Sequence, residues 1–315
     1  MGEPPAAPLP RRRTSLAGAG LVVLAGLVLV LALAGRGSAG NAPETETAGT
    51  NGPARHIGPQ GRVGQFVVKC VYSHSGAMDP IVHPGQPGRS HQHDFFGAVG
   101  VDAHTTAADL LDRPTTCDKT PDTASYWHPA LYDSGLLVQP VHLHAYYRAA
   151  PQVDPEDVEP FPFGLELITG DPTATRAASG EAAGWVCGVS TRLRSEPPTC
   201  PASAPLHMVL TFPDCWDGSD LRSDDHRSHV AYSRAGRCPD SHPVHVPQLT
   251  VSVKYPITGT GHDLSLASGS VFSAHGDFLN AWDPAGLERE VRQCIRRDVV
   301  CDLASNREED GPFFG

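Results

Sequence analysis

The sequence lacks the short motifs that mark several common enzyme and metal-binding classes. It contains no His-Glu-x-x-His motif, which excludes a zincin-type metalloprotease, and no Gly-x-Ser-x-Gly motif, which argues against an α/β-hydrolase serine. None of its eight cysteines forms a Cys-x-x-Cys pair, so a zinc knuckle is not expected either. Any active or metal-binding site must therefore be assembled from residues that lie far apart in the chain.

Lysine is scarce, and acidic residues outnumber basic ones. Residues 1–40 hold four arginines and one glutamate, which leaves 20 basic and 34 acidic residues in the remainder and a formal net charge of −14 there. Three of those basic residues are lysines, namely Lys69, Lys119 and Lys254. Because a surface of this charge repels phosphate backbones and anionic lipid headgroups, we expect no nucleic-acid partner and no membrane contact outside the N-terminal segment.

The N-terminal segment has the pattern of an export signal. Three arginines at 11–13 precede residues 16–34, a run of 19 uncharged residues made of Leu, Val, Ala and Gly. The run is long enough for a membrane-spanning helix, whereas the Ala-Leu-Ala at 32–34 is typical of a cleavage site. Residues 1–34 are therefore predicted to be a signal peptide or a signal-anchor. The rest of the chain is predicted to be extracytoplasmic, either secreted or held by a single transmembrane helix whose N-terminus is inside.

The remaining chain divides into a linker, one domain and a tail. Residues 35–62 contain almost no large apolar side chains and are predicted to be a disordered linker. Residues 63–303 are predicted to form a single domain, and residues 304–315 a polar tail.

Strand patterns outnumber helix patterns within this domain. Apolar residues alternate in 137–148, 206–212 and 249–255, which is typical of half-buried antiparallel strands, and 65–72 is a short Val-rich run. Asp283 followed by Pro284 predicts the start of a C-terminal helix. We therefore expect a mainly β fold, with an antiparallel β-sandwich or jelly-roll-like core and long loops rich in Pro and Gly.

All eight cysteines lie in the exported part of the chain. An even number of widely spaced cysteines in an oxidising compartment indicates disulfides. Eight cysteines allow 105 pairings. Among these we favour pairing between neighbours along the chain: Cys70 with Cys117, Cys187 with Cys200, Cys215 with Cys238, and Cys294 with Cys301.

Histidines recur at a spacing that suits metal binding. In the string SHQH at 90–93, His91 and His93 are two residues apart in extended backbone, so both rings point to the same side. Such a pair offers two nitrogens to a divalent transition metal, which a third His or a carboxylate completes. We predict His229 as that third ligand, with His226, His275 and Asp79 as alternatives. The rival interpretation is that these histidines join loops through hydrogen bonds.

Carboxylates beside imidazoles indicate a second kind of chemistry. Acid/base catalysis is predicted for the pairs Asp225 with His229 and His275 with Asp277, and for His226 beside them. Aromatic residues in neighbouring loops could stack on sugar rings, or they could pin those loops to the sheet. The predicted stacking residues are Trp127, Tyr132 and Trp216.

Several strings resemble one family. They are similar to the domain of unknown function numbered nineteen ninety-six, which occurs in secreted bacterial and fungal proteins, sometimes joined to WSC-type carbohydrate-binding modules. The strings are DPIV at 79–82, SHQH at 90–93, YWHPALY at 126–132, FPDCWDG at 212–218, DHRSHVAY at 225–232 and HGDF at 275–278. The resemblance implies an extracellular domain near polysaccharide and brings no established activity; no WSC module is recognisable here.

The sequence thus predicts an exported domain whose loops gather histidines and aspartates around one polar cleft. In one interpretation the cleft belongs to a metal-assisted or acid/base enzyme that acts on envelope carbohydrate. In the alternative, the domain is a non-catalytic carbohydrate-binding or envelope scaffold protein.

Overall fold

The computed structural model describes residues 64–177 and 182–301. The expected signal or signal-anchor at 1–34, the linker at 35–62 and the tail at 304–315 lie outside the described residues. Among the residues that are described, no helix combines the length and the apolar character needed to cross a bilayer.

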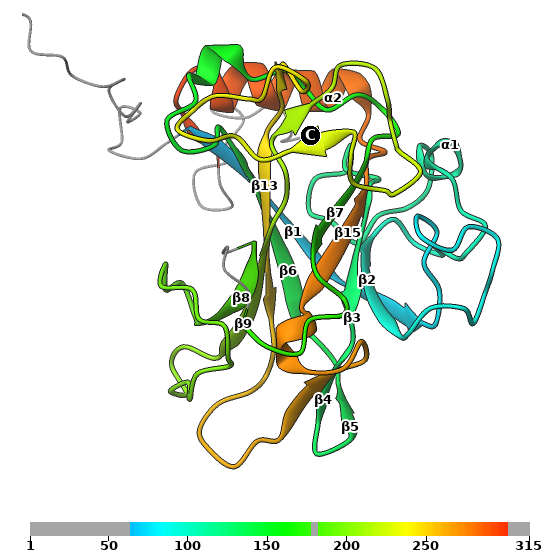
Figure 1. Ribbon diagram of the computed structural model, residues 1–315, viewed down its shortest axis with the longest axis vertical. Coiled ribbons are helices and arrows are strands. Elements are labelled where there is room, and N and C mark those ends of the chain that lie inside the picture. Colours follow the sequence, from blue (N-terminus) through cyan, green and yellow to red (C-terminus); the bar gives the residue numbers. More distant parts are fainter. Residues whose placement is uncertain (1–63, 178–181, 302–315) are drawn as a thin grey trace, which may run out of the picture. The chain divides into compact units, whose positions relative to one another are not determined.

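The prediction of a mainly β fold is confirmed. Within the described ranges, ten strands form one sheet with the order β7-β15-β3-β2-β1-β6-β13-β9-β8, and β16 lies beside β1 (Figure 1). All neighbours are antiparallel except β16, which runs parallel to β1. The strands are β1 (Gln65–Gly76), β2 (His93–Gly97), β3 (Ser125–Pro129), β6 (His142–Arg148), β7 (Glu166–Gly170), β8 (Ala183–Cys187), β9 (Leu206–Thr211), β13 (Gln248–Lys254), β15 (His275–Leu279) and β16 (Val300–Cys301).

Smaller elements decorate this sheet. The described residues also form two three-stranded sheets, one of β10 (Cys215–Trp216), β11 (Val230–Ala231) and β12 (Val244–His245), the other of β4 (Leu131–Asp133), β5 (Leu136–Val138) and β14 (Leu264–Leu266). The expected C-terminal helix is α2 (Pro284–Glu290), where the Asp283 carboxylate accepts a hydrogen bond from the Gly286 amide, 2.7 Å. Four further short helices in the described ranges are α1 (Ala107–Leu110), the 3₁₀ helices η1 (Pro155–Asp157) and η2 (Val271–Ser273), and the π-helix η3 (Val291–Ile295).

The large sheet curls into a nearly closed, barrel-like form instead of the predicted sandwich. Strand β1 pairs with β6 over residues 65–71 and with β2 over residues 72–76. The pairing with β2 shifts register between Tyr72 and His74. The far ends of the sheet approach each other where the Thr169 hydroxyl of β7 donates to the Thr211 carbonyl of β9, 2.6 Å. Alternation in sequence shows that one face of a strand is buried. It does not distinguish a second sheet from the same sheet folded back on itself.

A separate layer covers the outside of one half of the sheet. The main core fills the curl and includes Tyr126 and Phe278. A smaller apolar cluster contains Trp127 of β3, whose side chain points to the opposite face from that of Tyr126. The segment between β1 and β3 covers this outer face, contributing Ile81, Ala98, Val101 and Leu110. Both faces of β2, β3 and β15 are therefore buried.

The four disulfides are Cys70–Cys117, Cys187–Cys200, Cys215–Cys238 and Cys294–Cys301. They coincide with the sequence-neighbour pairing, and no cysteine is left free. Four disulfides in one domain indicate an extracytoplasmic location, because cytoplasmic thiols are kept reduced.

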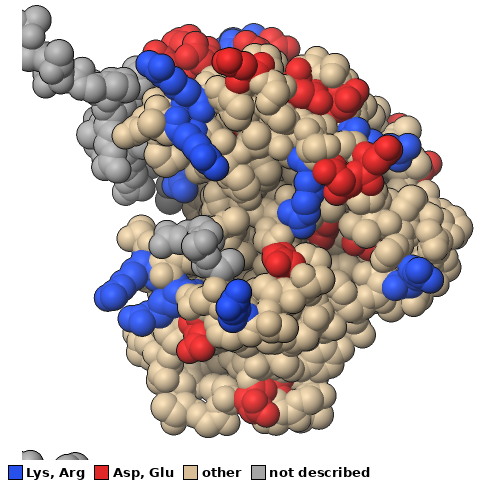
Figure 2. Space-filling model, viewed as in Figure 1, with Lys and Arg blue, Asp and Glu red and all other residues tan. Residues whose placement is uncertain are grey.

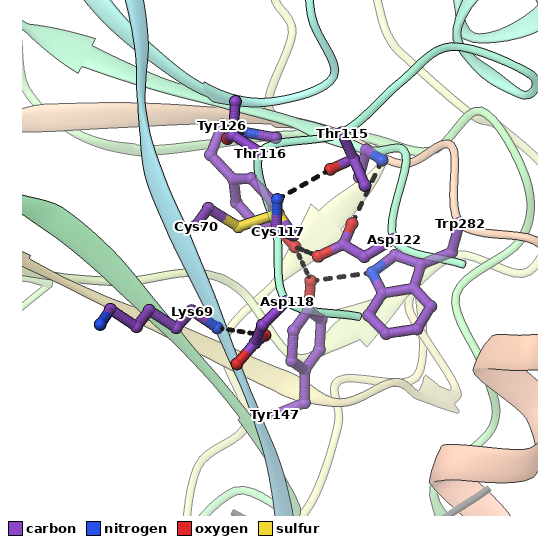
Figure 3. Close-up of a disulfide and its surroundings, with 12 residues drawn as sticks. Lys69, Cys70, Thr115, Thr116, Cys117, Asp118, Asp122, Tyr126, Tyr147 and Trp282 are labelled. Carbon is purple, nitrogen blue, oxygen red and sulfur yellow. Dashed lines mark hydrogen bonds between the residues drawn. A yellow bond between two sulfur atoms is a disulfide. The ribbon is translucent and has the colours of Figure 1, made fainter. Parts of the chain in front are cut away.

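A buried polar network lies beside the first of these disulfides (Figure 3). The Tyr126 hydroxyl donates to the Asp122 carboxylate, 2.7 Å, and is also bonded to the Tyr147 hydroxyl. The indole Nε1 of Trp282 donates to the Tyr147 hydroxyl, 3.2 Å. Burial raises the pKa of Asp122 to about 8, although the hydrogen bond from Tyr126 acts in the opposite direction. The network ties β3, β6 and the start of α2 together inside the core.

Candidate functional site

Three histidines converge on the covered outer face of the sheet. His93 is the first residue of β2, His275 is the first residue of β15, and His91 lies just before β2. The rings of His91 and His93 are 4.3 Å apart between centroids, as expected for a His-x-His pair on one side of extended backbone. One ring nitrogen from each of the three histidines lies within 4.8 Å of the others. We call this group the His cluster.

Backbone carbonyls fix the orientation of two of these rings. The Nδ1–H of His93 donates to the Met78 carbonyl, 2.9 Å, and the Nδ1–H of His275 donates to the Ser273 carbonyl, 2.8 Å. Because a carbonyl oxygen only accepts, Nδ1 carries the proton in both rings and Nε2 keeps its lone pair. The Nε2 of His93 is buried and has no partner among the described residues. Histidines that bind metal ions are commonly held by such an outer hydrogen bond.

Two buried aspartates adjoin the His cluster. Oxygens of Asp79 and Asp277 lie within 4.8 Å of each other and of a ring nitrogen of His93. Asp79 accepts hydrogen bonds from the amides of Ile81 and Val82, at 3.0 and 2.9 Å. Asp277 is 2% exposed, and its Oδ2 has no partner within the described ranges. The three histidines and these two aspartates together form what we call the His-Asp cluster.

Burial disfavours every charged form in the His-Asp cluster. It lowers the pKa of His93 well below its ordinary value and that of His275 to about 3. It raises the pKa of Asp79 and, more strongly, that of Asp277, whose carboxyl also lies near the charge of Asp79. A divalent cation would reverse this preference for the aspartates, since two ionised carboxyls beside three neutral imidazoles carry a charge of −2 that the cation neutralises.

The separation of the nitrogens fits a shared metal ion. The Nε2 atoms of His91 and His275 are 3.2 Å apart. Two nitrogens bound to one tetrahedral zinc ion lie about 3.3 Å apart, given Zn–N bonds of roughly 2.0–2.1 Å. Three other groupings of possible ligands among the described residues each contain two cysteines that are joined in a disulfide, so they offer no thiolate.

His229, predicted as the third metal ligand, is not in the His cluster. Its Nε2 donates to the Glu166 carbonyl of β7, 2.7 Å, and its Nδ1 lies 3.0 Å from the Ser223 hydroxyl. Both ring nitrogens are therefore occupied. His275, one of the predicted alternatives, lies in the His cluster, because the sheet places β15 two strands from β2.

Asp225 organises a loop rather than joining the His-Asp cluster. Its Oδ1 accepts hydrogen bonds from the Ser223 hydroxyl, the Arg227 amide, and the amide and hydroxyl of Ser228, at 2.7 to 3.1 Å. These bonds hold the pKa of the exposed Asp225 well below its ordinary value. His226 in the same loop has a φ of 58°, and its Nδ1 is buried with no partner in the part of the chain described.

Arg227, which the sequence analysis did not single out, lies in this loop beside the His-Asp cluster. Its Nη2 donates to the Gly170 carbonyl, 3.0 Å, and Gly170 is the β7 residue that pairs with His275. In the string DHRSH, only the histidines and the aspartate were predicted to be site residues. The position of Arg227 depends on the strand order, which puts this loop along the edge strand β7.

Of the three predicted stacking aromatics, Trp127 borders the His-Asp cluster, because its position in β3 pairs with Asp277 of β15. Trp127 is 1% exposed and stacks on Phe95, with centroids 5.6 Å apart. Trp216 is half-buried against the main core and donates through Nε1 to the Asp220 carbonyl, 2.7 Å. Tyr132 is half-buried in β4. The ring of Trp127 is therefore buried inside the fold and is not exposed to a sugar ring in solvent.

A second His-x-His pair, His142 and His144, lies elsewhere on the sheet. Their rings are 4.5 Å apart on β6. His142 pairs with Lys254 of β13, and His144 with Lys69 of β1. Burial, together with the smaller effects of His144 and the lysines, lowers the pKa of His142 to about 4. Neither histidine belongs to a grouping of ligand atoms within the described residues that could hold a metal ion.

Fold and site together define a disulfide-bonded, mainly β extracytoplasmic domain that buries a group of histidines and aspartates beneath an added layer. The chain belongs to the family described as Domain of unknown function (DUF1996), whose model matches residues 79–282. This span includes all five residues of the His-Asp cluster. No curated protein and no solved structure matches the chain.

Proposed function

We propose that the domain binds one divalent transition-metal ion at the His-Asp cluster and uses it to assist hydrolysis of an envelope carbohydrate. The ligands are the Nε2 atoms of His91, His93 and His275 together with an oxygen of Asp79 or Asp277. The observations that carry the proposal are the convergence of His93 with two further imidazoles and with two carboxyl groups, and the buried Nε2 of His93 and Oδ2 of Asp277, which have no partner among the described residues. Buried polar atoms are rarely left without a partner unless something else binds them.

The ligand set suits activation of water. A metal ion held by three imidazoles and one carboxylate would lower the pKa of a bound water and polarise an oxygen of the substrate. The aspartate that does not bind the metal ion would accept a proton from the attacking water and return it to the leaving oxygen. One water is consumed for each bond cleaved. Carbohydrate is the proposed substrate for two reasons. The disulfides indicate an extracytoplasmic location, and the resemblance to the DUF1996 family implies a location near polysaccharide.

A scaffold or binding role is the second candidate, and one observation favours it. The Nε2–H of His91 can donate to the Nε2 of His275 across 3.2 Å, which joins two segments without any metal ion. In that case the His cluster only fastens the outer layer to the sheet.

Elemental analysis of the purified protein separates the two candidates. We expect about one zinc, manganese, iron, nickel or copper ion per chain, removed by a chelator and restored by dialysis against the metal salt. His93→Ala and His275→Ala should lose the ion. His262→Ala is the matched control, since His262 is an exposed imidazole bonded to Asp133, 2.6 Å. A wild-type protein that takes up none of these metals contradicts the proposal.

The substrate is tested on the metal-loaded protein. A panel of cell-wall polysaccharides is incubated with the wild type and with His93→Ala, and new reducing ends are measured. We expect release that depends on both the metal ion and His93. Metal binding without release from any glycan would leave the metal centre standing and contradict the carbohydrate substrate.

A further inference from the structure

Arg227 is held in place at the edge of the His-Asp cluster. Its guanidinium donates to the Gly170 carbonyl, 3.0 Å, on the β7 residue that pairs with His275. The guanidinium therefore lies beside the end of β15 that carries His275.

Several hydrogen bonds hold the loop around Arg227 in place. Asp225 bonds the Arg227 amide, 3.1 Å, and the Ser228 amide, 2.8 Å. His229 anchors the loop to the Glu166 carbonyl, and His242 donates to the Ser228 carbonyl, 2.9 Å. The residues expected to be catalytic from the sequence, Asp225 and His229, therefore act as positioning residues for this loop. A side chain held in this way loses little conformational freedom when it binds a ligand.

Most of the hydrogen-bonding capacity of Arg227 remains available. A guanidinium has five N–H donors, and one of them is used on Gly170 within the described ranges. No described carboxylate lies within ion-pair distance of it. Arg227 is exposed and His91 is half-buried, so a ligand from solvent can reach both.

Arg227 has no ion-pair partner among the described carboxylates. Hydrogen bonds from Thr173 lower the pKa of the exposed Asp171, and the charge of Arg227 lowers it as well, so Asp171 offers a nearby counter-charge without blocking the guanidinium. Asp79 and Asp277 would neutralise a divalent cation and leave Arg227 for a ligand. An arginine fork matches the paired oxygens of a phosphate or carboxylate group, which are also ligands for a divalent metal.

We infer that the substrate of this centre carries an oxyanion, a phosphate or a carboxylate, that binds Arg227 beside the metal ion. This inference rests on the proposed function, because it assumes the metal centre. It narrows the substrate from envelope carbohydrate in general to its anionic members.

The test uses the protein loaded with Co²⁺, whose visible absorption reports on metal-bound ligands. Inorganic phosphate and acetate are titrated separately, to distinguish the two oxyanions. We expect saturable binding of at least one of them, and Arg227→Gln should weaken it about tenfold or more, the loss expected for a charge-assisted hydrogen-bonded pair. Arg227→Lys keeps the charge without the fork and should recover part of the affinity. Arg192→Gln, at an exposed arginine of the β8–β9 connection, is the matched control.

The outcomes separate this inference from the metal site. Equal anion affinity in the wild type and Arg227→Gln, with equal Co²⁺ content, overturns the role of Arg227 and leaves the metal centre intact. If neither anion changes the absorption of the Co²⁺-loaded wild type, the role of Arg227 is also overturned and the metal centre remains. Failure of the wild type to bind Co²⁺ overturns both proposals.

Discussion

At the scale of single residues, the notable group is the buried carboxyl of Asp277, one oxygen of which has no partner among the described residues. Asp277 is 2% exposed, and its Oδ2 meets no donor among the described residues. Burying such a group costs free energy unless a cation or a donor compensates it. The unpartnered oxygen of Asp277 therefore weakens the metal-free fold and favours metal binding. A substitution at Asp277 should change both the stability and the metal affinity.

Asp277→Asn separates these two effects. We expect the variant to melt at a higher temperature than the wild type when both are metal-free at neutral pH, because burial raises the pKa of Asp277 and the neutral amide removes the cost of protonating that carboxyl on folding. With saturating Zn²⁺ the order should reverse, because the variant loses an anionic ligand and its affinity falls at least tenfold. Thermal melts with and without Zn²⁺ measure both. Asp240→Asn, at an exposed position, is the control. A variant that melts lower in both conditions would show that Asp277 is only structural.

At the scale of elements, the loop at 223–229 and the buried strands show what the sequence could reveal. Strands β1, β9 and β13 were predictable, since 65–72 is a Val-rich run and apolar residues alternate across 206–212 and 249–255. Strands β2 and β15 were not, because both of their faces are buried and no alternation exists to detect. These are the strands that carry His93 and His275. The His-x-His spacing pointed to the site, but choosing His275 over His229 required the strand order.

Asp225→Asn tests the role of the loop. The substitution removes the charge that accepts hydrogen bonds from Ser223 and Ser228, so we expect faster amide exchange across residues 223–229. Exchange in β15 and the metal content should stay unchanged, and phosphate binding should weaken less than in Arg227→Gln. Hydrogen exchange followed by mass spectrometry gives the first readout. Loss of the metal ion in Asp225→Asn would instead support the direct site role predicted from the sequence.

At the scale of the whole molecule, charge is distributed unevenly. On the face shown in Figure 2, acidic and basic side chains are interspersed toward the end where α2 lies, and the part around β4 and β5 is mostly uncharged. Two ionisable groups with strongly raised pKa values are buried beneath the surface. Asp122 lies in the network of Figure 3, and Glu290 is fully buried 3.2 Å from the Lys119 ammonium. Burial raises the pKa of Asp122 to about 8 and that of Glu290 to about 7, the latter against the opposing charge of Lys119.

These shifts fix the sign of the pH dependence. A carboxyl whose pKa is raised in the folded state stays protonated there while the unfolded chain is ionised, so stability falls as pH rises from about 4 through the folded pKa. Buried histidines act in the opposite direction: burial lowers the pKa of His128 to about 4, so its contribution grows up to about pH 6.5 and is then complete. Above about pH 6.5 the buried histidines add no further change, and the raised carboxyls dominate. The hydrogen bond with Asp133 raises the pKa of the exposed His262, so its small contribution is lost in the same direction.

We therefore expect the metal-free protein, with its disulfides intact, to lose stability between pH 6.5 and 8. Asp122 alone accounts for about 1–2 kcal/mol of that loss, which corresponds to a drop in Tm of about 2–8 °C for a domain of this size. Asp122→Asn keeps an oxygen that accepts from the Tyr126 hydroxyl and removes the ionisation, so its Tm should fall distinctly less over the same interval. Calorimetric melts of both proteins in chelator at the two pH values measure this, with Asp240→Asn as the control. If the wild type and Asp122→Asn lose the same number of degrees, Asp122 is already ionised in the folded protein at pH 6.5. The network around Tyr126 and Tyr147 must then stabilise a buried charge rather than a buried acid.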